Sequence, residues 1–169
     1  MKFLSEDIDS LRGLYIDQLL HMHSAESQIT EALPKMIEAA ATPELRSALE
    51  THLQETRGHV SRLDQILTRT QGSAKSRKNK GINALIAEGE DVVTDAKDPM
   101  VRDAGIIGAA QKIEHYEIAA YGTLRTYAEI LNETSDAGLL QQTLQEEKHA
   151  DEVLTQIAGS ANLEADRAA

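Results

Sequence analysis

Hydrophobic positions recur every three or four residues along most of this 169-residue chain. Such spacing gives each helix one apolar stripe and is typical of helices that pack side by side. The strict alternation of apolar and polar residues that marks β-strands is missing, and the helix formers Ala, Leu, Glu, Gln and Lys dominate. The pattern therefore predicts an all-α fold.

Capping signals divide the pattern into four long helices and one short one, expected at residues 5–40, 42–70, 82–96, 99–132 and 135–158. Ser5 is the predicted N-cap of the first helix, and Pro34 is expected to bend or interrupt it. Thr42-Pro43-Glu44 and Asp98-Pro99 each place a capping residue before a proline, a common start of a helix.

The order of these helices predicts a four-helix bundle made of two helical hairpins. The polar, basic segment QGSAKSRKNK at residues 71–80 and the short helix cross from one hairpin to the other. A single domain is expected over residues 1–160, followed by a flexible tail at residues 161–169.

Charged residues interrupt the middle of each apolar stripe. In order along the chain, the polar residues on the stripes are Glu26, His52, Glu55, His59, Glu114, Glu117, Glu147 and Asp151. Several carboxylates buried at one depth repel one another unless cations compensate. Because helical bundles are known to hold pairs of metal ions between inward carboxylates, the pattern predicts a dinuclear metal site.

The last long helix offers two sets of ligands. Glu147 and Asp151, four residues apart, lie on its apolar stripe, whereas Glu146 and His149 show the Glu-x-x-His spacing but lie one step off it. The stripe favours the first pair, and the second remains an alternative. Tyr15 and Tyr121 also lie on stripes and are candidates for hydrogen bonding or electron loss near the metals.

Composition narrows the function further. A formal net charge of −11 argues against nucleic acid or an anionic membrane as a partner, and the short basic run KSRKNK is interpreted as a solvated linker. The absence of cysteine excludes disulfides, iron–sulfur clusters and thiolate ligands. The chain shows neither a signal peptide at MKFLSEDIDS nor an apolar run of membrane-spanning length, so a cytoplasmic location is expected.

Four segments carry a family resemblance, namely SAESQITEALPKM, HLQETRGHVSRLDQIL, AAQKIEHYEIAAYGTL and LQEEKHADEVLTQIA. Together they resemble the YciF-like bacterial stress proteins of the ferritin-like superfamily, over residues 3–158. The resemblance implies a ferritin-like bundle, often dimeric, with a dinuclear metal site. It points to carboxylate ligands at Glu26, Glu55, Glu114, Glu117 and Glu147. Relatives can carry Gln at position 59, where His59 is a better ligand, and Asp151 follows the acidic motif of the family.

Carboxylates with imidazole and without thiolate suit two divalent ions, with iron expected first and manganese or zinc as alternatives. We expect Glu55 and Glu147 to bridge the two ions. Glu26, Glu114 and Glu117 are expected to be terminal or flexible ligands of one or the other ion. Three functions are compatible with such a site. The chain is a di-metal oxidoreductase that reacts with oxygen or hydrogen peroxide, a metal-binding protein without turnover, or a helical stress protein that acts through partner contacts. A homodimer is expected in each case.

Overall fold

The computed structural model describes residues 8–71 and 78–167. Within them the chain forms helices and no strand, so the all-α prediction is confirmed. The helices are α1 (Leu11–Ala39), α2 (Pro43–Gln71), α3 (Lys80–Asp95), α4 (Pro99–Ile130) and α5 (Thr134–Arg167). None of these helices combines the length and apolarity needed to cross a membrane.

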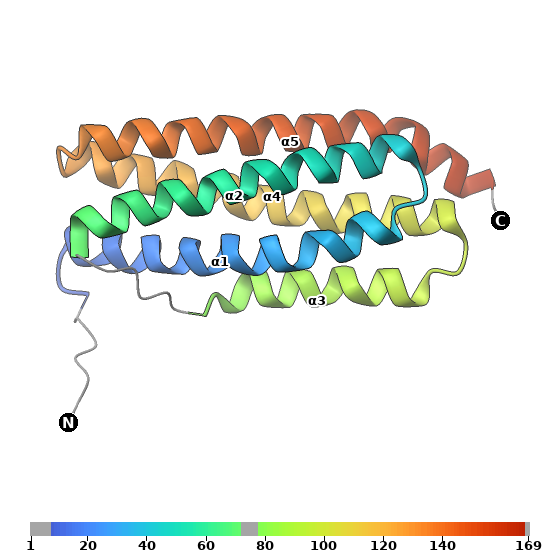
Figure 1. The fold of residues 1–169 in the computed structure, drawn as a ribbon, viewed down its shortest axis with the longest axis horizontal. Coiled ribbons are helices and arrows are strands. Elements are labelled where there is room, and N and C mark those ends of the chain that lie inside the picture. Colours follow the sequence, from blue (N-terminus) through green and yellow to red (C-terminus); the bar gives the residue numbers. More distant parts are fainter. Residues whose placement is uncertain (1–7, 72–77, 168–169) are drawn as a thin grey trace, which may run out of the picture.

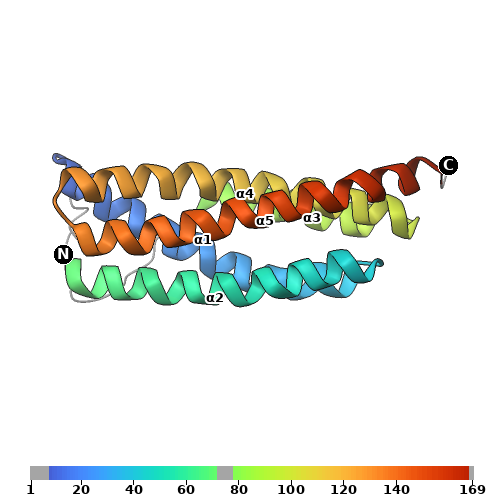
Figure 2. The same ribbon diagram turned by 90° about the horizontal axis from the view of Figure 1, so that it is seen from above.

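The four long helices lie lengthwise beside one another, in two hairpins (Figures 1 and 2). Helix α1 packs against α2 and α4 against α5, and the hairpins meet where α1 contacts α4 and α2 contacts α5. The shorter α3 lies along α1 and α4, on the outside of this arrangement (Figure 1). The apolar stripes of the long helices therefore enclose one shared core.

Local sequence signals explain most helix boundaries. Asp98 caps α4 by accepting hydrogen bonds from the backbone N–H groups of Met100 and Val101. Helix α4 ends at Ile130, and Asn132, two residues further on, adopts the left-handed conformation (φ 61°) that often terminates a helix. Ser10 caps α1, whereas the predicted cap Ser5 lies outside the described residues.

One predicted helix end is wrong. Helix α1 continues through Pro34 to Ala39, close to the predicted end at residue 40, so the proline does not interrupt it. Helix α5 does not end near Ala158 but runs to Arg167. Ala161 is buried and continues the apolar stripe, so most of the expected flexible tail is helical.

A glycine brings α3 close to α4. A Cβ atom built on Gly105 would lie 2.2 Å from Cγ1 of Val92, a distance that no side chain tolerates. The neighbouring Gly108 has nothing within 4 Å of such an atom. Gly105 thus allows a close contact between α3 and α4 of the same chain.

Two buried polar residues fasten the connections between helices. Asp103 of α4 accepts hydrogen bonds from the backbone N–H groups of Ala41 and Thr42, at 2.8 Å each, and from the Thr42 hydroxyl at 2.7 Å. It thereby holds the α1–α2 connection and the start of α2 against the second hairpin. Asn79, the cap of α3, bonds the Ser24 hydroxyl through its backbone N–H and the Tyr116 hydroxyl through its side chain. Within the end of the predicted solvated linker, Asn79 is therefore buried, whereas its neighbours Lys78 and Lys80 are exposed.

Candidate metal centre

Acidic and imidazole side chains from all four long helices meet inside the core. Glu26 comes from α1, His52 and His59 from α2, Glu114 and Glu117 from α4, and Glu147 from α5; all are buried. The helical spacing explains this, because each residue continues an apolar stripe whose other members pack into the core. Five of the predicted ligands therefore lie together, and His52 joins them.

Potential ligand atoms form two overlapping groups. One atom from each of His52, Glu114, Glu117 and Glu147 lies within 4.8 Å of the others, and the same holds for Glu26, His59 and Glu147. Glu147 belongs to both groups, which matches its expected bridging position. Each group combines carboxylate oxygen with imidazole nitrogen, a donor set suited to iron or manganese.

Many of these buried oxygens have no hydrogen-bond partner. Both carboxylate oxygens of Glu117 lack one, as does Oε2 of Glu114 and of Glu26. Neither oxygen of Glu147 makes a well-aligned hydrogen bond, although its Oε1 lies 3.0 Å from Nδ1 of His59. Buried polar atoms in proteins are nearly always paired, because an unpaired one costs about 1–3 kcal/mol, and more when it is charged. The described residues thus concentrate unmet acceptors at the place where the two groups overlap.

Burial and mutual repulsion favour protonation of the acids in the metal-free chain. Burial raises the pKa of Glu114 and of Glu117 well above the usual range, and the charges of Glu147 and Glu26 raise both further. Burial also raises the pKa of Glu147, against the opposing effect of His59, to about 7. The fold therefore holds carboxyl groups that would release protons when a cation arrives.

His59 is oriented by contacts at both ring nitrogens. Its Nδ1 lies 3.0 Å from Glu147 and 3.4 Å from Glu26, while its Nε2 lies 2.9 Å from Oε2 of Glu146. Arg62 in turn bonds both oxygens of Glu146, at 2.7 and 2.9 Å. Metal-binding histidines commonly donate the second ring N–H to a carboxylate, and Glu146 fills that place here.

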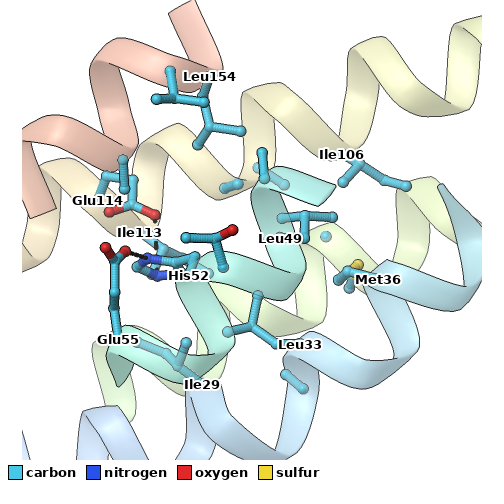
Figure 3. A pocket seen from close by; sticks show the side chains of 18 of the residues that line it. Ile29, Leu33, Met36, Leu49, His52, Glu55, Ile106, Ile113, Glu114 and Leu154 are labelled. Atoms are coloured by element: carbon cyan, nitrogen blue, oxygen red, sulfur yellow. Dashed lines mark ion pairs between the residues drawn. The ribbon is translucent and has the colours of Figure 1, made fainter. Parts of the chain in front are cut away.

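Electrostatics distinguish the two histidines. Burial lowers the pKa of His59, but the adjacent Glu147 and Glu26 outweigh it and raise the pKa to about 11. Burial, together with the charge of His59, lowers the pKa of His52 to about 4. His52 is consequently a neutral imidazole near pH 7, the form that binds metals. Its Nε2 lies 3.3 Å from Oε1 of Glu114 (Figure 3).

The two candidate tyrosines, Tyr15 and Tyr121, make different contacts. Tyr121 is fully buried and donates a hydrogen bond to Oε1 of Glu26. Burial and the charge of Glu26 raise its pKa well above the usual value, so the hydroxyl keeps its proton. Tyr15 instead donates to Asp136 at 3.1 Å, and Asp136 also pairs with Arg69, so only Tyr121 contacts the group of acids.

Four predicted or alternative ligands lie at the margin of the two groups or outside them. The Glu55 side chain is 28% exposed and belongs to neither group, although its Oε2 lies 3.9 Å from Nδ1 of His52. Asp151 contacts Gln111 and the exposed His115 instead. Of the alternative pair, His149 is exposed and Glu146 is held by Arg62, so the stripe register through Glu147 describes α5 better.

His52 lies on the predicted stripe of α2 but is not among the ligands that the family resemblance implies. Its spacing was the available signal, since it lies seven residues, or two helical turns, before His59. The contact of Glu146 with His59 left no such signal, because Glu146 lies off the stripe and 87 residues away.

Comparisons with known proteins agree with this fold. Residues 10–166 match a protein family described as Domain of unknown function (DUF892). The chain is 40% identical to Protein YciF of Escherichia coli (strain K12) over 154 residues, which cover 90% of this chain and 92% of that protein. The crystal structure of the E. coli stress protein YciF matches with a TM-score of 0.87 over 91% of this chain and 98% of that one.

A more distant structure supports the fold alone. A protein from Xanthomonas campestris pv. campestris matches with a TM-score of 0.75 at 21% identity, over 93% of this chain and 96% of that one. The arrangement of helices is therefore retained at a sequence similarity that carries no information about activity.

Proposed function

The chain belongs to the DUF892 family, and we propose that it is a stress protein that holds two divalent metal ions in its core. The ions are iron or manganese, and the centre handles oxidants or iron. The proposal takes the stress role from the name of the E. coli relative and the metal centre from the residues of this chain.

The observation that carries the proposal is the set of unpartnered, buried carboxylate oxygens. Glu26, Glu114, Glu117 and Glu147 carry a formal charge of −4 when ionised, and two divalent ions carry +4. Arg62 bonds Glu146, which belongs to neither group, and the hydroxyl of Thr143. Two ions would therefore supply the partners and the charge that these oxygens lack.

The candidate ligands divide between the two groups. Glu26 and His59 would hold one ion, His52, Glu114 and Glu117 the other, and Glu147 would bridge them. Glu55 and Asp151 remain proposed ligands that would have to turn inward. Bound iron or manganese would supply redox chemistry with oxygen or hydrogen peroxide. The chain itself buries the site from water, fixes the His59 ring through Glu146 and holds a proton on Tyr121.

The proposal also covers the type of bundle, the oligomeric state and the location of the protein. We assign the four long helices to a ferritin-like bundle, with α3 as the additional helix of the crossover between α2 and α4. We also propose that the protein is a homodimer in the bacterial cytoplasm. Analytical ultracentrifugation tests the dimer.

The decisive experiment measures metal binding and turnover separately. Metal-free protein is loaded with Fe(II) or Mn(II) without oxygen, and bound metal is counted by mass spectrometry. We expect two ions per chain in the wild type and in the exposed control Glu152→Gln, and fewer than one in Glu147→Gln. A chain that binds neither ion contradicts the proposal.

Turnover then decides which form of the proposal holds. Oxygen or hydrogen peroxide is added to the Fe(II)-loaded protein, and oxidation of iron is followed by absorbance. Rapid, repeated oxidation supports an oxidoreductase. Bound metal without turnover supports the second candidate, a protein that buffers ions, which the fully enclosed position of Glu117 and Glu147 favours.

A further inference from the structure

A cavity of about 620 Å³ opens from the molecular surface toward the metal centre. All five helices contribute apolar side chains to its wall, such as Leu33, Leu49, Ile86, Ile106 and Leu154. Its size lies within the range of pockets that bind small organic molecules, about 300–1,000 Å³. A mainly apolar wall of this kind offers water few hydrogen bonds.

The cavity reaches the centre at two of its six candidate ligands. His52 and Glu114 line the cavity and also belong to one group of candidate ligands. Figure 3 shows His52, Glu55 and Glu114 gathered on one side, with Leu49 and Ile106 on the other. A molecule that fills the apolar part would therefore have one end beside the acids and the imidazole.

The entrance lies between α2 and α5. Ser47 and Thr51 of α2 and His149 of α5 line the cavity and are exposed, whereas Leu49 and Ile106 are buried. The cavity thus leads from a polar rim to an apolar interior and then to the centre.

The wall offers a charged ligand little compensation. Apart from Glu44, Glu55 and Glu114, the described lining residues are mostly aliphatic and include neither lysine nor arginine. A carboxylate, phosphate or sulfonate group would lose hydration without gaining a lysine or arginine partner, and a cationic group would lose hydration against the aliphatic wall.

We propose that this cavity binds an uncharged, largely apolar organic molecule, with one end against His52 and Glu114. This inference depends on the proposed function in one respect, namely that the bound molecule contacts the proposed metal ions. Binding itself depends on the cavity and can be measured on metal-free protein.

Two matched fluorescent probes test the charge preference. N-phenyl-1-naphthylamine is uncharged and apolar, and 8-anilinonaphthalene-1-sulfonate has the same rings with a sulfonate. The neutral probe should bind the metal-free chain saturably, with one site, and at least about tenfold more tightly than the sulfonate. Equal binding of both probes, or no saturable binding of the neutral one, would overturn the proposal.

Substitutions that fill the cavity locate the bound probe. Ala110→Phe and Ala48→Phe each place a ring in the cavity from a different helix, and Ala87→Phe is the matched control on an exposed face of α3. Circular dichroism and thermal unfolding identify variants that fold. Each folded cavity variant should bind the neutral probe at least about tenfold more weakly, and the control should bind it as the wild type does.

The outcomes separate this inference from the metal proposal. Metal binding without probe binding contradicts this inference but supports the metal centre. Probe binding without metal binding supports this inference but contradicts the metal centre. If the neutral probe does not bind and Ala110→Phe instead changes the association state, a second copy of the chain covers the cavity and the proposal is wrong.

Discussion

The imidazole of His59 lies between Glu147 and Glu146, 3.0 Å from the first at Nδ1 and 2.9 Å from the second at Nε2. One ring nitrogen thus faces the candidate metal groups, while the other faces a carboxylate that Arg62 holds. Partial burial raises the pKa of Glu146, but the hydrogen bonds from Arg62 and Gln142 and the contact with His59 outweigh it and lower the pKa. Glu146 therefore stays ionised and positions His59.

Replacing Glu146 with Gln is expected to weaken metal binding without unfolding the protein. The amide keeps the size of the side chain but removes the charge that fixes the His59 ring. Loss of such an outer contact typically costs about 10- to 100-fold in metal affinity. Competition with a metal chelator measures the affinity, with Glu152→Gln on the exposed face of α5 as control. Equal affinities of wild type and Glu146→Gln would remove the positioning role.

Replacing Glu117 with Gln should abolish loading of one ion and stabilise the metal-free protein. Both oxygens of Glu117 are buried without partners and its pKa is raised well above the usual range, so above pH 7 the side chain must take up a proton on folding, a cost that the neutral Gln of the same shape avoids. We expect a gain on the order of 1 kcal/mol at pH 8. Urea unfolding with and without metal measures both effects. A large loss of stability in the metal-free state would show that Glu117 has a structural role instead.

The metal-free protein should lose stability as the pH rises from about 7 to 9. The pKa values of Glu114, Glu117 and His59 are raised in the fold, so the folded chain holds more protons than the unfolded chain in this range. Stability then falls with rising pH. Metal binding displaces these protons, so the stabilisation by metal should grow over the same range. Thermal unfolding at several pH values tests both slopes, and a metal-free stability that rises with pH contradicts the assignment.

Two glycines of α4 should respond oppositely to alanine. Gly105→Ala places a Cβ atom against Val92 and should cost about 1–3 kcal/mol, because the short, branched valine cannot move aside easily. Gly108→Ala meets open space and should gain up to about 1 kcal/mol from helix propensity. Chemical denaturation compares the two. A similar gain at both positions would mean that α3 does not approach α4 so closely.

Replacing Asp103 with Ala should loosen the start of α2. Three donors from Ala41 and Thr42 lose a buried acceptor, which we expect to cost about 2 kcal/mol or more. Hydrogen exchange should speed up first near Thr42, and Asp91→Ala on the exposed face of α3 is the control. Unchanged exchange at Thr42 would show that the bonds are dispensable.

The periodicity of apolar residues was enough to predict the helices and to place Glu26, His59, Glu114, Glu117 and Glu147 inside the core. It worked because a helix has a fixed period, so a polar residue on the stripe must face inward. The period does not report how closely neighbouring helices approach each other. Glu55 is therefore partly exposed although it lies on the stripe, and the cavity that it lines left no trace in the sequence. Contacts across helices, such as Glu146 with His59, depend on relative rotation and rise, which are settled only by packing.

Both candidate groups include Glu147, and each also draws residues from the first hairpin. Glu147 lies in the last helix, and most of the chain precedes it. A ribosome therefore releases Glu26, His59 and Glu114 well before either group can be completed. A partly synthesised chain would offer only scattered, weak ligands, and the finished protein alone would present the assembled set. The order of residues along the chain thus places the completion of both groups after the synthesis of α5.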